Sequence, residues 1–389
     1  MNSVLRVEVK SWLEKNWNPE YRKDKPKWFR KVVEARYAVP TWSTQWYGRQ
    51  LDPDSAKVIE QEFARVGAPG AAQDSKHLGA ITVYHSGSEE LKKELLYKML
   101  TGGACCLLYS EPGAGSDLAG LRTKAELDGD EYVVNGQKIW TSAATIASYG
   151  MLLARTNWDV PKHKGISFFI LPMKQEGIDI RPIHQINGDS TFNEVFISDA
   201  RLPAKYVVGE LNEGWKVLSN ALEHERLVMS QGLTEKKKSR GKDSAQELID
   251  LARKAGRLVN PVLRQELAET IAYRQMHRLN ILRAKTEANT KSKAALYSIA
   301  KLSMSRVQHS EGSLRANIQG ASGLLDGPEY PDAKESHYYA AGAYVNSIGG
   351  GTDQIQRNII SERILGLPRE IEVDRKIPFK DVQSGIRRD

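Results

Sequence analysis

The feature that most constrains the fold of this chain is one block of strand-like sequence enclosed by two blocks with helical periodicity. Before residue 105 and after residue 208, apolar side chains recur at the spacing that gives a helix one buried face. Between these limits the apolar runs are short or alternate with polar residues, as strands do. This order predicts an α+β fold with an N-terminal all-α domain over 1–104, a middle β-barrel or sheet domain over 105–208, and a C-terminal helical bundle over 209–389.

The predicted elements are bounded by Gly, Pro, Asn and Asp, the residues that most often end helices and strands. Helices are predicted over 4–17, 54–66, 89–100, 214–233, 244–256 and 353–365, and two more from Pro261 and from about Lys291. Strands are predicted over 150–155, 165–171, 178–183 and 192–197. Asn135-Gly136 is a dipeptide that tight hairpin turns prefer, so strands at 131–134 and 137–140 are predicted to flank such a turn.

Composition excludes several classes of protein. Charged residues make up 27% of the chain, and no apolar run approaches the roughly 18 residues of a membrane-spanning helix. Residues 1–10 lack the apolar core of a secretory signal. The two cysteines, Cys105 and Cys106, are sequence neighbours, which rarely form a disulfide because the bridge would strain the backbone. We therefore expect a soluble, cytoplasmic protein with no membrane contact and no metal site.

The net charge of +8 raises the question of a nucleic-acid partner. Only 236–243 is densely basic, and it also contains Ser, Gly and Asp, whereas acids and bases alternate elsewhere. We interpret this run as a solvated loop between helices and predict no nucleic-acid binding. Attraction to an anionic small molecule or to a partner protein is the alternative interpretation of the run.

The middle domain opens with Ser-Glu-Pro-Gly-Ala-Gly-Ser-Asp at 110–117, whose glycines allow a ligand to approach the backbone closely. By itself this segment is a loop, since it lacks the glycine pattern of dinucleotide-binding and P-loop folds. Together, however, 109–125 and 135–142 resemble the flavin-binding core of acyl-CoA dehydrogenases. Gly-Thr-Asp-Gln-Ile-Gln-Arg at 351–357 resembles a late helix of the same family, so the resemblance extends through most of 50–370.

The resemblance implies FAD as the cofactor and an acyl-CoA thioester as the substrate. A hydrogen-bond donor directed at flavin N5 would stabilise the reduced ring. Trp140, which the resemblance places beside N5, could also pack in the core, and the two roles are compatible. By position, the resemblance places Tyr109, Ser110 and Ser116 against the isoalloxazine, Ser116 also near CoA, Trp140 and Ser142 beside N5, Asn317 and Gly320 against a neighbouring subunit's FAD, and Thr352, Asp353 and Gln354 at the adenosine end.

The reaction needs a carboxylate beside the α-carbon of the substrate. Many family members carry it directly before the late Gly-Thr pair, but this chain has Gly350 there. The helix predicted from Gly214 offers Glu225, which shares a face with an apolar stripe made of Trp215, Leu218, Leu222 and Met229. Burial in that stripe is costly unless the carboxylate is paired or functional, and it raises the pKa towards that of a general base. The alternative to a catalytic role is that Glu225 forms a salt bridge and serves only the structure.

Isovaleryl- and long-chain-type members place their base on this helix in a Glu-Arg-Leu segment, which 225–227 resembles. The resemblance therefore implies desaturation of the acyl chain to a trans-2-enoyl-CoA, with Glu225 as the base and Arg226 holding CoA or orienting that base. The backbone near Gly350 and Gly351 would bind the thioester carbonyl. Glu223, about 160° away from Glu225 around the helix, is assigned to the substrate site and ranked below it as a base.

Two departures weaken the part of the flavin site that neighbouring subunits donate. The family's Arg-x-x-Phe-Gly segment is missing, with Arg253 and Arg257 as candidates to replace its cation, and Asn317 and Ala321 stand where the family has Gln and Gly. This pattern resembles members that form α2β2 heterotetramers and act on bulky acyl groups such as steroid side chains. A homotetramer and an α2β2 heterotetramer both remain open.

The family implies a role in β-oxidation of fatty acids or steroid side chains, with an electron-transferring flavoprotein as the electron acceptor. Two alternatives use the same fold. One is a non-catalytic partner subunit of a heterotetramer, and the other is an oxidase or monooxygenase. The acyl group is set by the shape of a pocket built from scattered residues, which the sequence does not reveal.

Overall fold

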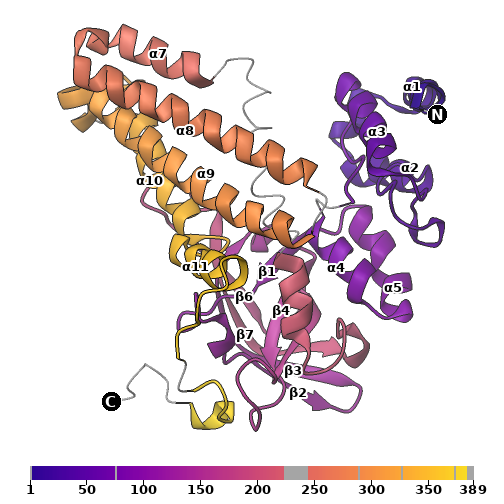
Figure 1. The fold of residues 1–389 in the computed structure, drawn as a ribbon. Coiled ribbons are helices and arrows are strands. Elements are labelled where there is room, and N and C mark those ends of the chain that lie inside the picture. Colours follow the sequence, from indigo (N-terminus) through magenta and orange to yellow (C-terminus); the bar gives the residue numbers. More distant parts are fainter. Residues whose placement is uncertain are drawn as a thin grey trace. The chain divides into compact units, whose positions relative to one another are not determined.

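The computed structural model describes residues 2–74, 77–222, 244–287, 290–325, 327–371 and 374–382 (Figure 1). The chain divides into two compact units. The first unit comprises 1–183, 190–224 and 373–389, and the second comprises 184–189 and 225–372.

The first unit begins with helices whose ends follow from local capping. Asp52 accepts hydrogen bonds from the first turn of α3, which starts with Pro53 and ends at Gly67, a glycine with φ of 69°. Ser88 caps α5 in the same way. The helices are α1 (Asn2–Asn16), α2 (Lys25–Glu34), α3 (Pro53–Val66), α4 (Leu78–Ser86) and α5 (Glu89–Leu100). The helices predicted over 4–17, 54–66 and 89–100 are confirmed, whereas α2 and α4 were not predicted.

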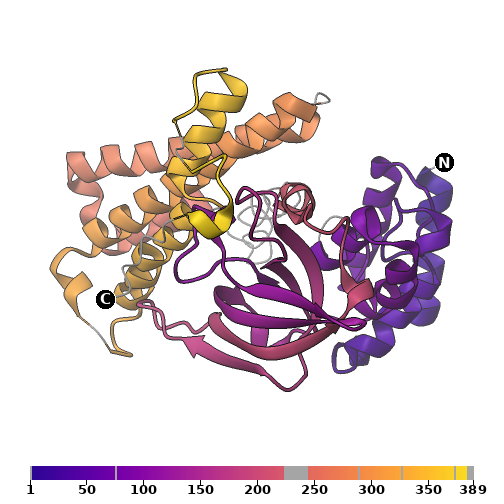
Figure 2. The same cartoon turned by 90° about the horizontal axis from the view of Figure 1, so that it is seen from below.

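A curled sheet follows these helices in the first unit, and Figure 2 shows the two side by side. Its strands are β1 (Cys105–Leu108), β2 (Lys124–Asp128), β3 (Glu131–Ser142), β4 (Tyr149–Arg155), β5 (Ile166–Pro172), β6 (Ile178–Ile183) and β7 (Phe192–Pro203). The sheet order is β1-β4-β2-β3-β7-β6, with β5 paired to β4. Strands β4 and β5 are almost entirely buried, which explains their apolar sequence. The four predicted strands beyond residue 149 are confirmed.

The predicted turn at Asn135-Gly136 is wrong. Strand β3 runs through both residues, and its hairpin with β2 turns at Gly129, where φ is 65°. Gly136 serves another purpose, because a Cβ atom at this position would lie 2.7 Å from the Cα of Thr123. The glycine thus permits close approach of a neighbouring segment, and the long-range pairing of β3 with β7 overrides the local turn preference.

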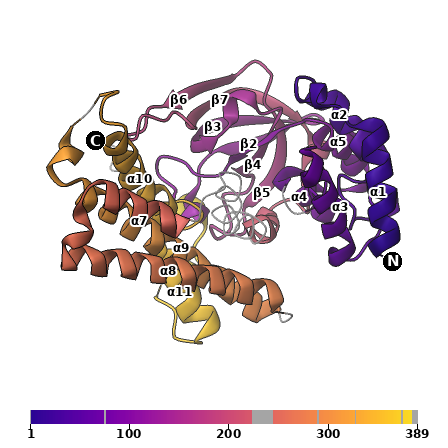
Figure 3. The ribbon, with the colours of Figure 1, turned by 90° about the horizontal axis from the view of Figure 1, so that it is seen from above.

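The second unit is a bundle of long helices, labelled in Figure 3. Pro261 occupies the first turn of α8, in line with the helix predicted from this residue, and Asn260 caps that helix. The helices are α7 (Ser244–Lys254), α8 (Pro261–Thr286), α9 (Thr290–Gln319), α10 (Pro331–Ile348) and α11 (Asp353–Ile359), which continues as a π-helical turn over Ile360–Ile364. The predicted helices are confirmed, and α10 is an addition. No helix in the described ranges is long and apolar enough to span a bilayer.

Residues 214–222 return the chain to helix within the first unit. Leu218 and Ala221 are buried, while Lys216, Ser219 and Asn220 are exposed, so the described turns have one inward face. Trp215 and Leu222 pack against the core from the edges of that face. This is the apolar side predicted for the helix. Its predicted continuation over 223–233 lies outside the described residues.

Candidate active site

A buried carboxylate organises the 109–123 loop of the first unit. Glu111 accepts hydrogen bonds from the backbone N–H groups of Arg122, at 2.7 Å, and Thr123, at 2.9 Å. A tight turn follows, because the backbones of Glu111 and Ala114 bond each other in both directions. The loop is therefore closed on itself through one side chain, and its two ends are held together.

Lys138 on β3 fixes this loop to the sheet. Its ammonium, in a fully buried side chain, donates to Glu111 Oε1 at 2.8 Å and to the carbonyl of Tyr109 at 3.0 Å. The N–H of Ile139 donates to the carbonyl of Ser110 at 2.9 Å. Tyr109 and Ser110, both predicted flavin contacts, are thus held in place by the strand that leads to Trp140.

The charges of this pair depend on each other. Burial alone would raise the pKa of Glu111, but the Lys138 ammonium and the N–H donors outweigh it and lower that pKa. Burial lowers the pKa of Lys138, and Glu111 opposes that shift. An ion pair that satisfies both groups is therefore the form that this interior can hold.

Strand β3 presents Trp140 outward by an irregularity in its backbone. The register against β7 shifts between Lys138 and Thr141, and Trp140 has a φ of 61°. Such bulges re-aim side chains near functional sites. The Trp140 side chain is 57% exposed and touches Phe192 edge-on. An exposed indole held in this way is a flat surface available to a ligand.

The hydroxyls predicted around this indole are also accessible. Ser142 at the end of β3 and Ser116 in the 109–123 loop are exposed, and Ser110 is partly so. Tyr109, by contrast, is buried at 7% exposure and packs edge-on to Phe168. The structure therefore brings Tyr109 and Ser110 to β3 through backbone bonds, with Trp140 and Ser142 further along the same strand.

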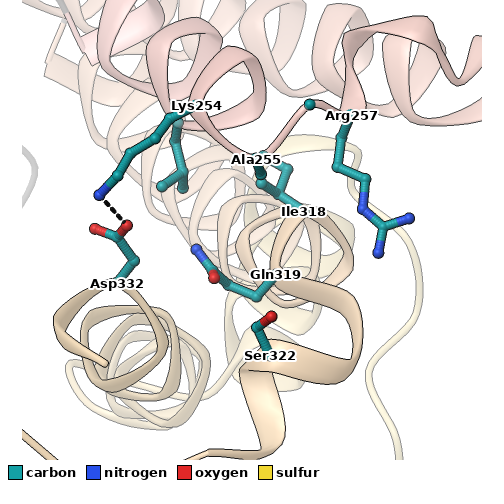
Figure 4. A pocket seen from close by; sticks show the side chains of 9 residues that line it. Lys254, Ala255, Arg257, Ile318, Gln319, Ser322 and Asp332 are labelled. Carbon is teal, nitrogen blue, oxygen red and sulfur yellow. Dashed lines mark hydrogen bonds and ion pairs between the residues drawn. The ribbon is translucent and has the colours of Figure 1, made fainter. Parts of the chain in front are cut away.

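The second unit contains a separate group of predicted residues at the ends of α7 and α9. A pocket of about 420 Å³ is lined by Lys254, Arg257, Gln319 and Ser322, among others (Figure 4). A second pocket, beside Arg257, is lined by Asn317 and Gly320. Lys254 is paired with Asp332, as the dashed line in Figure 4 shows. Polar groups from two helix ends converge here.

Arg257 is the cation that the structure brings to this place. A Cβ atom at Gly320 would lie 2.2 Å from Nη2 of Arg257, so the guanidinium lies directly against the glycine backbone. Gly320 also has a φ of 54°, which favours glycine. Arg253, the other candidate, instead pairs with Asp250 on its own helix at 2.6 Å. Within the described ranges, no carboxylate forms an ion pair with Arg257.

The turn before α11 holds the remaining predicted residues of the second unit. Gly350 and Gly351 have φ values of 66° and 85°, a conformation that only glycine adopts readily. Thr352 caps α11, and Asp353 bonds Lys301 at 2.9 Å and Ser305 at 2.7 Å. Gln354 lies in the first turn of the same helix. The turn is therefore anchored to α9 through Asp353.

Three side chains that shape these sites are not predicted from the sequence. Gln356 is fully buried and donates to the carbonyl of Gly350 at 3.1 Å. The sequence signal that could have pointed to Gln356 is its position within the 351–357 motif that resembles the family. Glu111 and Lys138 also lie inside the matched motifs, but their pairing joins residues far apart in sequence. The predicted base Glu225, with Glu223 and Arg226, lies outside the described residues.

Comparison with protein families decides the class. The model of the acyl-CoA dehydrogenase N-terminal domain matches residues 2–103, that of the middle domain 106–200, and that of the C-terminal domain 212–365. The chain belongs to the acyl-CoA dehydrogenase family. Its fold class and its assignment to oxidoreductases that act on CH–CH groups are thereby confirmed.

Two named relatives each align with 80% or more of this acyl-CoA dehydrogenase. Acyl-CoA dehydrogenase IpdE1 of Mycolicibacterium smegmatis is 32% identical over 95% of this chain and 98% of its own. The long-chain specific mitochondrial enzyme of Sus scrofa is 29% identical over 80% of this chain and 73% of its own.

Solved structures agree with these relatives. The steroid acyl-CoA dehydrogenase Tcur3481-Tcur3483 has a TM-score of 0.70 and 29% identity over 95% of this chain and 98% of its own. The ChsE4-ChsE5 complex of Mycobacterium tuberculosis has a TM-score of 0.66 and 29% identity over 95% of this chain and 98% of its own.

The residues present fit the FAD that the family uses. In the first unit, the exposed Trp140 ring and the Ser142 hydroxyl offer a flat face and a donor, as an isoalloxazine requires. In the second unit, Arg257, which has no ionic partner among the described residues, lies beside Gly320 and offers a cation over open backbone, as a pyrophosphate requires. Each unit thus carries groups suited to one part of the cofactor.

Prediction one concerns the buried pair. Lys138→Met leaves Glu111 buried without its cation, so the free energy of unfolding should fall by about 3–5 kcal/mol. Lys124→Met is the matched control on the same sheet, since its exposed pair with Glu126 should change stability by no more than about 0.5 kcal/mol. Urea unfolding measures both.

The pH dependence of the wild type is a second readout of this pair. Because the pKa of Glu111 is depressed in the folded state, its stabilising contribution is complete above the ordinary carboxyl pKa and is lost as the pH falls through the depressed value. Lys138→Met should flatten this part of the stability curve. Equal losses of stability in the Lys138 and Lys124 variants would contradict the role assigned to the pair.

Proposed function

We propose that this chain is an FAD-dependent acyl-CoA dehydrogenase that desaturates its substrate to a trans-2-enoyl-CoA, with Glu225 as the base. The observation that carries the proposal is the turn at Gly350. It lacks the carboxylate that many members hold there, so the base must come from another element. The helix that begins at residue 214 is the element with a suitable carboxylate in sequence.

The described turns of that helix support Glu225 over Glu223. Gly214, Leu218 and Ala221 are buried on one face, and a period of about 3.6 residues returns to that face at position 225. On the same period, position 223 is predicted to share a face with Lys216 and Ser219, which are exposed. A carboxylate on the inward face meets apolar surroundings, which raise its pKa and make it a stronger base for an α-proton.

Each remaining group has one task in this mechanism. Glu225 removes the α-proton while the backbone N–H at Gly350 donates to the thioester oxygen, where negative charge develops. Gln356 holds the carbonyl of Gly350, which orients the peptide unit between Gly350 and Gly351 in the same turn. Arg226 holds CoA or orients Glu225. FAD, when bound, supplies the acceptor for the β-hydride, and an electron-transferring flavoprotein is the proposed acceptor of the electrons.

The second prediction tests the base. Glu225→Gln keeps the size of the side chain but removes its basicity, so anaerobic bleaching of bound flavin by acyl-CoA should slow by about 10²- to 10⁴-fold. Flavin content, measured from the visible spectrum, should not change. Glu213→Gln, at an exposed carboxylate directly before the same helix, is the control and should bleach within about threefold of wild type. Undiminished bleaching in the Glu225 variant would contradict the assignment of Glu225 as the base.

Arg257 is the proposed replacement for the cation of the missing Arg-x-x-Phe-Gly segment. Its contact with Gly320, and the pockets on either side of it, support a role in binding the FAD of a neighbouring chain. Asn317 lines one of these pockets and donates to Glu266 at 2.9 Å. Arg253 is engaged with Asp250 and offers less to a ligand.

The third prediction compares these two arginines. Arg257→Ala should raise the dissociation constant of FAD by roughly tenfold or more, because a charge-assisted contact to phosphate is lost. Arg253→Ala should leave it within about twofold, since only an exposed pair is removed. Fluorescence titration of FAD into apoprotein gives both values. The same dissociation constant in both variants would argue against Arg257.

The proposed substrate is a bulky, polycyclic acyl-CoA rather than a straight-chain one. One of the solved relatives is named as a steroid acyl-CoA dehydrogenase, and it and the ChsE4-ChsE5 complex are named as pairs of chains. The altered residues Asn317 and Ala321 fit the same interpretation, because a different partner chain would meet this part of the site. An α2β2 heterotetramer is therefore the proposed assembly.

The fourth prediction is a preference for ring-bearing substrates. With a ferrocenium-type acceptor, kcat/KM should be at least about tenfold higher for a steroid-side-chain CoA ester than for a straight-chain ester of similar length. Equal values for the two esters would reject the bulky-substrate proposal and leave the base assignment intact. A flavin-replete, active homotetramer from the chain expressed alone would separately exclude the heterotetramer.

A further inference from the structure

The 374–382 segment lies against the connection between β4 and β5 in the first unit, which is far from it in sequence. The N–H of Phe379 donates to the carbonyl of Val160 at 2.9 Å, and that of Lys380 to the carbonyl of Trp158 at 3.0 Å. Lys380 also pairs with Asp159 at 2.7 Å. The Phe379 side chain is 1% exposed and packs on Trp158. The segment is thus docked by backbone bonds, an ion pair and a buried ring.

Phe379 covers a buried cation. Its ring centre lies 3.5 Å from the guanidinium carbon of Arg155, at the end of β4, whose side chain is fully buried. No carboxylate pairs with Arg155 within the part of the chain that the structure describes. The ring face supplies favourable electrostatics to the desolvated cation. Burial nevertheless lowers the pKa of Arg155 to about 10.

Arg155 links Phe379 to the 109–123 loop through hydrogen bonds. Its guanidinium donates to the carbonyls of Ala119 at 2.7 Å, Leu121 at 3.2 Å and Lys162 at 3.1 Å. Two of these carbonyls belong to the loop that bears Ser110 and Ser116. A ring over one face of the guanidinium excludes water, which would otherwise compete for the same donors.

Lys162 forms a parallel link between the segment and the loop. Its ammonium lies 3.2 Å from carboxylate oxygens of both Asp117 and Asp374. The Lys162 side chain is 7% exposed, so this bridge is shielded from solvent on the lysine side. Asp117 directly follows Ser116. The segment therefore reaches the loop by two routes that share no side chain.

We propose that the 374–382 segment positions the 109–123 loop for flavin and acyl-CoA binding, with Phe379 and Arg155 as positioning residues. The identity of the ligands in this inference rests on the proposed function, whereas the effect of the segment on the loop does not. The segment stabilises one loop conformation through Arg155 and Lys162, and so keeps Ser110 and Ser116 in place without touching a ligand itself. Misplacing such groups by about 1 Å can lower the rate by roughly 10²-fold.

The fifth prediction uses Phe379→Leu, which keeps an apolar plug but removes the ring face. Amide hydrogen exchange at Glu111, Ala114 and Leu121 should accelerate by roughly tenfold or more, because the loop opens more often. Exchange in β4 and β5 should not change. Phe63→Leu is the matched control: Phe63 is also buried, at 2% exposure, but it packs on Trp12 and Trp28 away from the loop.

Ligand binding is the second readout. Phe379→Leu should weaken FAD binding roughly tenfold and raise KM for acyl-CoA by a similar factor, with kcat changed less, as expected for lost positioning in the ground state. Phe379→Tyr keeps the ring and should restore both values. Phe63→Leu should lower the melting temperature without altering FAD affinity, which separates general destabilisation from loss of positioning.

The outcomes distinguish this inference from the proposed function. Loop exchange and FAD affinity in Phe379→Leu that match those of Phe63→Leu would overturn the positioning role. A third outcome is that the wild type binds no FAD, yet the loop amides still exchange faster in Phe379→Leu. That result would support the contact between the segment and the loop and would reject the flavin assignment. Arg155→Lys is a check on the pathway, because a lysine cannot reach three carbonyls at once and should accelerate the same amides.

Discussion

The buried pair of Glu111 and Lys138 is the interaction on which the first unit's site depends. One carboxylate gathers two backbone N–H groups and an ammonium, and that ammonium also holds the carbonyl of Tyr109. Two charges are costly to bury, so this arrangement is stable only while every donor and acceptor is matched. The matched set leaves the 109–123 loop one conformation, and that conformation leaves the hydroxyls of Ser110 and Ser116 accessible to a ligand.

The loop is held from two directions that use different chemistry. From the β3 side the hold is ionic, through Lys138, and the same strand then turns Trp140 outward at a bulge. From the other side Arg155 binds carbonyls while Phe379 covers it. Among the described residues Arg155 pairs with no carboxylate, so its contact depends on exclusion of water, while Lys162 adds an ionic link to Asp117 and Asp374. The Arg155 contact should therefore depend less on acidity than the Glu111 hold does.

Local signals in the sequence predicted those features that local chemistry decides. Pro261 favours the first turn of a helix when a helical pattern follows it, and the structure has the helix predicted from this residue. The turn predicted at Asn135-Gly136 was wrong because β3 continues through these residues to pair with β7, which is distant in sequence. Gly136 is needed there because Thr123 approaches it closely. Glu111 was passed over for the same reason, since its partner Lys138 is brought to it only by the sheet. Arg257 could be named from sequence, but only the fold sets it against Gly320.

The turn at Gly350 shows why a base on a helix suits this chain. Gly350 and Gly351 both adopt left-handed backbone conformations, which cost roughly 1–2 kcal/mol for a residue with a side chain. With Gln356 holding the carbonyl of Gly350, the turn is specialised for backbone contact with a ligand. A carboxylate at position 350 would add strain and fill space beside the thioester. In the proposed mechanism, a base on the helix that begins at residue 214 separates proton removal from carbonyl binding at this turn.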